Sequence, residues 1–367
     1  MGEVSESYSG GTPSVGNKSY YGGSIPFIRS AEINSESTEL FLTEEGLTDS
    51  SARMVSKGDI LYALYGATSG ETGRSRINGA INQAILAILP HDGYDSEFLM
   101  QWLRKSKQNI TDIYLQGGQG NLSGAIVKAL EVNFPSLAEQ RQIGNYFQSI
   151  DHLIILHQQK ITLLIKLKKA MLEKMFPKKG SVIPEIRFNG FANAWEQRKV
   201  SELFRVTRGY VLAATQTETE KTDEKPYPVY SSQTKDKGLM GYYKDYLYED
   251  AITWTTDGAN AGTVNYRAGK FYCTNVCGVL LSNEVKANQM IAEALNNVAK
   301  GYVSYVGNPK LMNNVMADIV IQIPTHPEER EQISSFFANL DHLITLHQRK
   351  LDMLKKLKSA CLSEMFI

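Results

Sequence analysis

The chain has 367 residues, with 39 lysines and arginines against 39 aspartates and glutamates, so its formal net charge is zero. This length allows two ordinary domains, and 42% hydrophobic and 21% charged residues are typical of a soluble globular protein. Zero net charge argues mildly against a free-standing nucleic-acid binder, which must neutralise phosphates. Three cysteines cannot build a disulfide framework, and no apolar run approaches the ~20 residues that span a bilayer. A reducing cytoplasm and no membrane contact are predicted.

Residues 1–133 form the first predicted domain. Short β-type runs at 60–65 and 81–89 flank a glycine-rich turn at 66–70, and a helical pattern follows at 96–107. Residues 181–322 repeat this outline, with β-type runs at 251–255 and 273–281, a glycine-rich turn at 257–262 and a helical pattern at 287–298. Both domains are therefore predicted to mix α and β structure, although their sequences differ widely.

A long helix is predicted after each domain. The sequence Pro135-Ser136-Leu137-Ala138-Glu139 is a capping box, and helical periodicity continues from it to about Phe176. The same device recurs at 324–328, where Thr325 is the expected cap, and that helix continues to about Phe366. About 40 helical residues give a rod of roughly 60 Å. We assign 134–180 and 323–367 to two spacer helices.

The two helices are copies of each other. At a fixed offset of 190, 16 of the 26 positions of residues 151–176 are identical to those of residues 341–366. The apolar residues of each helix form two adjacent stripes, of which one suffices for an antiparallel coiled coil. The second stripe is free for another subunit, or else it packs on the chain's own domains. The positions assigned to helix pairing and subunit docking are Ile150, Ile154, Ile161, Leu164, Leu167, Met171, Leu340, Ile344, Leu351, Leu354, Leu357 and Met365.

The predicted fold class is therefore α+β, with two globular domains separated by two long antiparallel coiled-coil helices in a pseudo-twofold internal repeat. Charge is distributed unevenly over the repeat. Residues 137–179 carry eight basic and three acidic residues, whereas residues 328–364 carry six of each. The excess of lysines is either a solvated helix face or a surface that meets phosphate or a partner.

The sequence carries no recognisable catalytic motif. There is no phosphate-binding loop of the G-x-x-x-x-G-K-[ST] type and no Asn/Asp-Pro-Pro-aromatic motif of an amino-methyltransferase. Cys273 and Cys277 lack the second Cys/His pair of a zinc site. A metal nuclease needs clustered carboxylates with a lysine, and Asp257, Glu284 and Lys286 match that requirement only at chance level. We predict no catalytic or metal-binding residue and no cofactor bound by this chain.

The domains are rich in groups that contact nucleic acids. Asn, Gln, Ser, Thr, Tyr and Arg side chains near glycine turns suit base-edge hydrogen bonds and phosphate positioning. In the first domain the DNA-binding candidates are Thr12, Ser14, Thr68, Ser69, Arg74, Arg76, Asn78, Gln116, Gln119 and Asn121. In the second they are Arg208, Tyr210, Ser231, Gln233, Lys235, Asn260, Asn265, Arg267, Asn308 and Lys310. Each alone resembles an ordinary loop residue, so the prediction rests on the clusters.

These features together resemble the specificity (S) subunit of type I restriction-modification systems. The resemblance covers almost the whole chain, and its carriers are the sequences SGGTPS at 9–14, QGNL at 119–122, PSLAEQRQI at 135–143, FNGF at 188–191, WEQRK at 195–199 and the repeated D-H-L-I…H-Q…K…L…K-L-K…M-F helices. The combination, repeated in this order, is highly specific.

The resemblance implies two target-recognition domains that each read one half of a split, asymmetric double-stranded DNA site, with the gap set by helix length. It implies two modification subunits, which use S-adenosylmethionine, and two restriction subunits, which use ATP and Mg²⁺. In the family a segment like residues 183–199 usually leads into the first domain too, whereas here that domain begins almost at Met1. Either the chain starts late or the given start omits this lead-in, and its omission would be expected to weaken closure of the two halves.

Two rival interpretations stay open at this stage. The first is a scaffold or adaptor with two ligand-binding domains on a coiled coil and no DNA recognition. The second is a divergent nuclease built on Glu284 and Lys286.

Overall fold

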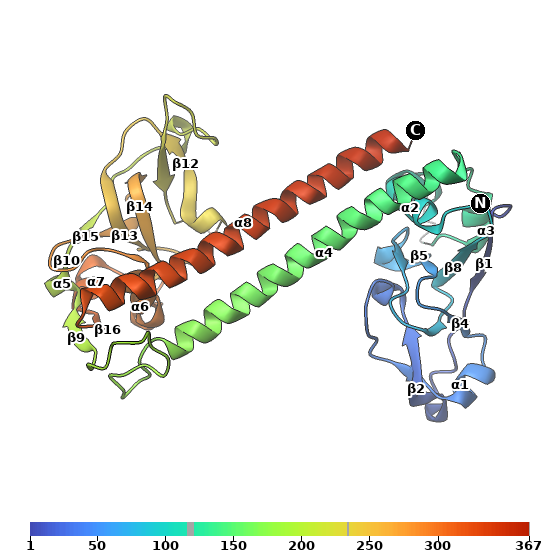
Figure 1. The fold of residues 1–367 in the computed structure, drawn as a ribbon, viewed down its shortest axis with the longest axis horizontal. Coiled ribbons are helices and arrows are strands. Elements are labelled where there is room, and N and C mark those ends of the chain that lie inside the picture. The colour runs from blue at the N-terminus through green and yellow to red at the C-terminus, as the bar shows by residue number, and fades with distance from the viewer. Residues whose placement is uncertain (116–120, 233–234, 367) are drawn as a thin grey trace. The chain divides into compact units, whose positions relative to one another are not determined.

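The computed structural model describes residues 1–115, 121–232 and 235–366. The chain divides into two compact units (Figure 1). Unit 1 comprises Met1–Gln158 and Arg349–Ile367, and unit 2 comprises Gln159–Gln348. Each of the two long helices, drawn green and red in Figure 1, contributes one part to unit 1 and the other part to unit 2.

Unit 1 contains two four-stranded sheets. The first has the order β1 (Ser5–Ser9), β8 (Ile85–Pro90), β5 (Ile60–Ala63) and β6 (Thr72–Arg74). The second has the order β3 (Phe41–Leu42), β2 (Tyr21–Ile28), β7 (Gly79–Ile81) and β4 (Arg53–Val55), and its β2–β7 pair is parallel. The helices are α1 (Glu44–Thr48), α2 (Ser96–Tyr114) and α3 (Gly124–Ala129).

The core of unit 1 forms between the first sheet and helix α2. Strands β5 and β8 are almost continuously apolar, which is expected of strands covered on both faces. One face packs on Leu99, Leu103 and Ile110 of α2, at helical spacing, and the other packs toward the second sheet. Asp95 caps α2 by accepting from the Glu97 and Phe98 N–H groups.

Unit 2 is built around a six-stranded sheet. Its order is β10 (Phe204–Arg208), β15 (Cys277–Ser282), β13 (Tyr248–Thr255), β14 (Val264–Cys273), β11 (Tyr227–Tyr230) and β12 (Leu239–Tyr243). β16 (Val320–Ile323) and β9 (Glu196–Lys199) form a separate antiparallel pair. The helices are α5 (Val200–Leu203), α6 (Gln289–Ala299) and α7 (Asn313–Asp318), and α6 packs on β14 and β16.

The strand pairings of unit 2 repeat those of unit 1. The antiparallel pairs β1–β8 and β5–β8 correspond to β10–β15 and β13–β15. The parallel pair β2–β7 corresponds to β11–β14, in which Val229 pairs with Tyr272 where unit 1 pairs Phe27 with Ala80. The internal repeat that the sequence predicted from the helices therefore extends to the sheets, and the predicted mixed α/β fold is confirmed.

The long helices are α4 (Leu137–Lys174) and α8 (Pro327–Met365). They run antiparallel within each unit: in unit 1 Phe147 of α4 stacks on Phe366 at the end of α8, and in unit 2 Phe176 at the end of α4 packs on Phe337 of α8. Ser136 caps α4 as predicted, since its Oγ accepts from the Glu139 N–H.

Three details of the sequence-based prediction were wrong. The residue before α8 is His326 rather than Thr325, because Pro327 starts the helix, where proline has no N–H to leave unpaired. The single strands predicted at 81–89 and 273–281 are each interrupted, at 82–84 and 274–276, by a turn between two strands. The helix predicted at 96–107 continues to Tyr114. The predicted domain limits at 133, 180 and 322 stay predictions.

Candidate nucleic-acid interface

Several loops of unit 1 meet at one edge of its first sheet, namely the edge at which β1 and β5 end and β8 begins. The Leu64 N–H donates to the Ala84 carbonyl (2.8 Å), and the Leu122 N–H donates to the Leu64 carbonyl (2.8 Å). Gly10 approaches so closely that a Cβ there would lie 1.8 Å from the Ile81 carbonyl oxygen, so a side chain is excluded. We call the polar and aromatic residues on this edge rim 1; they are Thr12, Tyr65, Thr68, Gln83 and Asn121.

The corresponding loops of unit 2 meet in the same way. The Thr256 N–H donates to the Val276 carbonyl (3.0 Å), and the Leu311 N–H donates to the Thr256 carbonyl (2.8 Å). A Cβ at Gly209 would lie 2.0 Å from the Cys273 carbonyl oxygen. We call this edge rim 2; its polar and aromatic residues are Arg208, Tyr210, Asp257, Asn275, Asn308 and Lys310.

The two rims share one backbone frame and carry different side chains. Leu64 and Thr256 occupy equivalent positions in this frame, as do Leu122 and Leu311. An isolated main-chain β-bridge joins Tyr65 and Asn121 in rim 1, and the equivalent β-bridge in rim 2 joins Asp257 and Lys310. In rim 2 the Asp257 carboxylate also lies 3.6 Å from the Lys310 ammonium. The geometry of the edge is thus preserved while its chemistry changes.

About half of the described candidates lie on exposed parts of the rims or in the loops that adjoin them. Thr12, Asn121, Arg208, Asn308 and Lys310 are exposed, and the Tyr210 side chain is 64% exposed. Ser14 is exposed in the loop that follows Thr12. Gln116, Gln119 and Gln233 lie outside the described residues, and Lys235 is described only as the first residue of a 3-10 turn.

Other candidates are engaged inside their own unit. The Arg74 guanidinium pairs with Glu97 (2.9 Å), the Asn78 Oδ1 accepts from the Lys57 N–H (2.7 Å), and the buried Ser69 hydroxyl donates to the Leu64 carbonyl (3.2 Å). These contacts account for the three side chains without a DNA partner. Arg76 differs from them, since it is exposed and lines a cavity of about 450 Å³ in unit 1.

Unit 2 shows the same division. Arg267 is buried, its guanidinium lies 3.6 Å from the centre of the Tyr230 ring, and burial lowers its pKa. The Ser231 hydroxyl accepts from Thr274 (3.0 Å), the Asn260 amide donates to the Ser232 carbonyl (3.2 Å), and Asn265 lies within β14, paired with Thr253. The Ser231 hydroxyl and the Asn260 amide are therefore each engaged within unit 2.

The rim residues Tyr65, Gln83, Asp257 and Asn275 were not among the DNA-binding candidates predicted from the sequence. Gln83 and Asn275 lie in the turns that interrupt the two predicted strands, at an offset of 192 residues. An offset of 190 was visible in the helices alone, because the domain sequences differ too much to align. The segments INQAIL at 81–86 and CTNVCG at 273–278 have no identical residue at this offset, so the sequence carries no signal that would locate Gln83 or Asn275.

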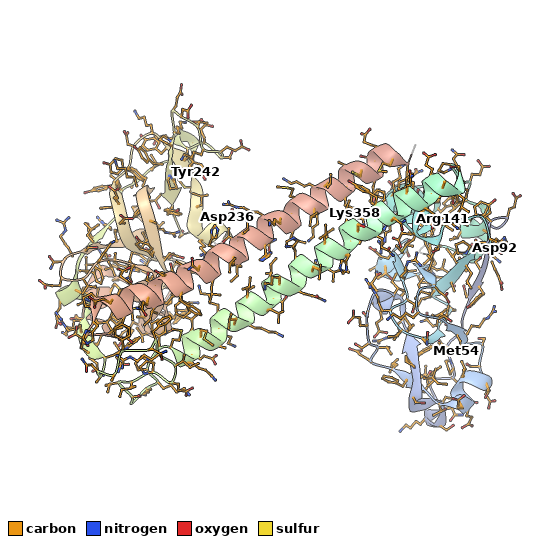
Figure 2. The ribbon with its side chains drawn as sticks, viewed as in Figure 1. Met54, Asp92, Arg141, Asp236, Tyr242 and Lys358 are labelled. Atoms are coloured by element: carbon orange, nitrogen blue, oxygen red, sulfur yellow. The ribbon has the colours of Figure 1, made fainter. Side chains whose placement is uncertain are left out.

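The repeated Asp and Lys of the long helices pair across them within each unit. In unit 1 Lys358 donates to the Asp151 carboxylate (2.6 Å), which also accepts from Arg104 (2.9 Å) and Gln101 (3.1 Å) (Lys358 is labelled in Figure 2). In unit 2 the equivalent Lys168 donates to Asp341 (2.7 Å) and to Glu293 (2.8 Å).

The two lysines respond differently to these surroundings. Burial is the largest single influence on the pKa of both lysines, and taken alone it acts to lower the pKa. For Lys168 the carboxylates of Glu293 and Asp341 outweigh burial, so its pKa is raised. For Lys358 burial and the nearby charge of Arg104 outweigh the carboxylates of Asp151 and Glu97, so its pKa is lowered.

The helix positions assigned to pairing and docking separate by exposure. Facing residues are buried or half-buried, namely Ile150, Ile154, Ile161, Leu164, Met171, Leu340, Ile344, Leu351 and Leu354. Leu167, Leu357 and Met365 are exposed instead. Leu167 and Leu357 are one pair of an exposed set that occurs at the same positions on both helices. We call this set the outer stripe. It consists of four pairs of equivalent positions, Leu153 and Leu343, Leu156 and Leu346, Leu163 and Met353, and Leu167 and Leu357, and all eight side chains are 36–67% exposed.

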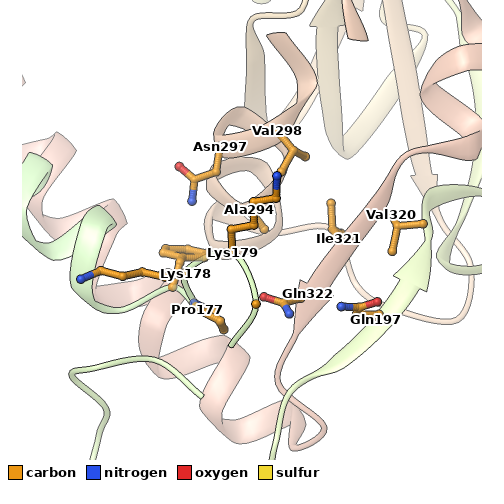
Figure 3. Close-up of a pocket in the computed structure, with 12 residues that line it drawn as sticks. Pro177, Lys178, Lys179, Gln197, Ala294, Asn297, Val298, Val320, Ile321 and Gln322 are labelled. Atoms are coloured by element: carbon orange, nitrogen blue, oxygen red, sulfur yellow. The ribbon is translucent and has the colours of Figure 1, made fainter. Parts of the chain in front are cut away.

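A cavity of about 520 Å³ in unit 2 lies where α4 ends (Figure 3). Lys178 and Lys179 of the linker, Asn297 of α6 and Gln322 of β16 are among its lining residues, and it holds no carboxylate or cysteine. Across residues 1–115, 121–232 and 235–366, no cluster of three His, Cys, Asp or Glu side chains could hold a metal ion. In the same ranges, none of the helices has the length and apolarity that crossing a bilayer requires.

The nuclease interpretation fails on geometry. Asp257 adjoins the start of β15, since the Thr256 N–H bonds to the Val276 carbonyl. Glu284 and Lys286 follow the other end of that strand, beyond Ser282. Six strand residues span about 20 Å, so these groups do not converge on one metal.

Comparison with known proteins agrees with this arrangement. The family model described as the type I restriction modification DNA specificity domain matches residues 1–189 and 192–356. An N-terminal type I specificity subunit protein of Mycoplasma pneumoniae is 37% identical over 140 residues, which are 37% of this chain and 73% of that protein. The type I restriction enzyme MjaIX specificity subunit of Methanocaldococcus jannaschii is 25% identical over an alignment that covers 99% of this chain and 90% of that protein.

A solved structure has the same fold. The crystal structure of the type I restriction-modification S subunit from M. genitalium matches with a TM-score of 0.76 and 15% identity, covering 100% of this chain and 94% of that one. The fold and the two rims define a protein in which one backbone frame occurs twice. The chain belongs to the family of type I restriction-modification specificity subunits, which are non-catalytic components of their systems.

Proposed function

We propose that this chain reads a bipartite, asymmetric double-stranded DNA site, with one half-site read by each rim. The observation that carries the proposal is the shared backbone frame of the two rims. A common frame with different side chains suits two surfaces that meet the same kind of ligand and select different sequences. The Tyr65–Asn121 bridge of rim 1 and the Asp257–Lys310 bridge of rim 2 are such a difference.

The long helices are proposed to set the gap between the half-sites. α4 and α8 each run without interruption from one unit into the other, and helix length is fixed at 1.5 Å per residue. The repeated pairs Lys358–Asp151 and Lys168–Asp341 support this role, because each fixes the register of one helix against the other.

The outer stripe is proposed to dock two modification subunits. Eight apolar side chains remain exposed on α4 and α8 at four equivalent pairs of positions, and exposed apolar surface of this extent marks interaction sites. Equivalent positions on both helices favour two copies of one partner. The modification subunits would bind S-adenosylmethionine, and two further restriction subunits would use ATP and Mg²⁺ in the assembled complex.

The deciding experiment is a methylome of cells that express this chain with its modification subunit. We expect one split motif with two different half-sites and a fixed gap. Duplex binding by the purified complex should also fall steeply as salt rises, because phosphate contacts release counterions. Binding that is insensitive to salt and to sequence, with no methylated motif, would refute the proposal and favour an adaptor with non-DNA ligands.

A further inference from the structure

We propose that Gln83 and Asn275 are equivalent base-reading residues, each of which contacts an adenine in the half-site of its own unit. The inference rests on the proposed function and names two residues for it. Both side chains are exposed, and both stand at the second position of the three-residue turn that precedes β8 or β15.

The equivalence of the two turns follows from their hydrogen bonds. In unit 1 the Ile85 N–H donates to the Asn82 carbonyl (3.2 Å), which closes the turn around Gln83. In unit 2 the Cys277 N–H donates to the Thr274 carbonyl (3.0 Å), which closes the turn around Asn275. Each of these four bonded residues has its counterpart 192 positions away, as do the two turn residues themselves.

Neighbouring chain segments hold each turn from two sides and leave its tip uncovered. On one side, the N–H of Leu64 donates to the carbonyl of Ala84 in unit 1, and the N–H of Thr256 donates to the carbonyl of Val276 in unit 2. Ala84 and Val276 are the last residues of their turns. On the other side is Gly10 or Gly209, packed against the carbonyl of the residue before the turn. A turn fixed in this way presents its middle side chain in a set direction, which base reading requires.

The polar groups of both side chains are available to a ligand. The Gln83 Oε1 accepts from the Thr12 hydroxyl (2.6 Å), which fixes the orientation of the amide, leaves one acceptor site on that oxygen and leaves both N–H donors unused. Among the described residues, Asn275 makes no side-chain hydrogen bond. A carboxamide pairs with adenine by accepting from N6 and donating to N7, and each amide here retains both capacities.

The neighbours of the two amides explain how the half-sites can differ around a shared adenine. Gln83 shares its rim with Tyr65 and Asn121, which are neutral. Asn275 shares its rim with Asp257 and Lys310, which carry opposite charges. The adenine contact would be common to both half-sites, and the flanking bases would be read by different chemistry.

The test selects bound duplexes from a randomised library with the full chain and its modification subunit. Asn275→Ala should lower the preference for adenine at one position of one half-site by about 5- to 150-fold. Gln83→Ala should do the same in the other half-site, so each half-site serves as the control for the other variant. Asn275→Asp should shift that position toward cytosine, whose N4 donates to a carboxylate.

Two controls separate a specificity effect from damage to the fold. Asn297→Ala removes an exposed amide of α6 in the same unit and should leave the selected motif unchanged. The thermal midpoints of all variants should match the wild type, because exposed turn residues contribute little to stability.

The outcomes distinguish this inference from the proposed function. If Asn275→Ala and Gln83→Ala both select the same motif as the wild type, the inference is overturned and the proposed function stands. Uniform loss of affinity at all positions would also overturn it, since phosphate contacts behave in that way. A wild type that selects no motif would overturn the proposed function and the inference with it.

Discussion

Replacing Lys168 by methionine is expected to destabilise unit 2 far more than replacing Lys358 destabilises unit 1, although the two lysines are equivalent in the repeat. Lys168 is the centre of its cluster, and its removal takes the ion pair from Glu293, whose side chain is 7% exposed. Among the described residues, Glu293 then keeps only its bond from Gln289 (2.8 Å), and Asp341 keeps only the exposed Lys237 (3.2 Å). Two partly buried carboxylates left in this state cost about 2–3 kcal/mol.

Removal of Lys358 has a smaller effect for a clear reason. Asp151 is the centre of that cluster and keeps both Arg104 and Gln101 after Lys358→Met. Methionine also retains most of the apolar stem of lysine. The expected loss is about 1 kcal/mol or less.

Hydrogen exchange with mass spectrometry is the assay, because it reports the opening free energy of α4 segments in each unit separately. Lys160→Met and Lys350→Met, at exposed and equivalent helix positions, are the controls and should leave exchange unchanged. Equal losses for Lys168→Met and Lys358→Met, or a larger loss for the latter, would refute the reasoning from the two clusters.

Three further results are expected. Leu163→Glu or Met353→Glu should reduce the number of modification subunits bound per chain from two to one, because each change places a charge in the part of the outer stripe that lies on one helix. Native mass spectrometry measures this number, and Leu163→Met and Met353→Leu should retain both subunits. Four residues inserted after Thr162 add about 6 Å and should lengthen the gap of the methylated motif while leaving both half-sites unchanged; altered half-sites with the original gap would contradict the spacer role. The hydrogen bond from Arg29 is the main cause that lowers the pKa of Glu32 to about 2. Ionised Glu32 therefore stabilises the folded state above about pH 4.5, and this stabilisation is lost as the pH falls toward 2. The unfolding free energies of wild type and Glu32→Gln should therefore converge over that range in urea titrations, and a constant difference would contradict the assignment.

The helices could be predicted from the sequence because their signals are local. Ser136 and the apolar spacing from Ile150 onward give the start, direction and buried face of α4 without knowledge of other segments. Thr325 was misplaced by one residue because a proline at the first helical position competes with the capping pattern.

The rims could not be predicted in the same way. They depend on hydrogen bonds between residues far apart in sequence, such as the bond from Leu122 to Leu64, which no local pattern records. Arg267 and Arg74 carry the charge expected of a DNA contact and are engaged inside the protein, because burial is decided by strand register. Gln83 lay within an apolar run that was interpreted as one continuous strand.

The closure of each rim by main-chain bonds has a consequence for how this protein can change. Bonds such as Leu64 to Ala84 and Thr256 to Val276 use only peptide groups, so substitutions of the outward-facing side chains remove none of them. Side chains at Gln83 and Asn275 can therefore be exchanged at little thermodynamic cost. Under the proposed function, new target preferences would arise by single substitutions in the rims, while the close approach of Gly10 and Gly209 to neighbouring carbonyl groups stays unchanged.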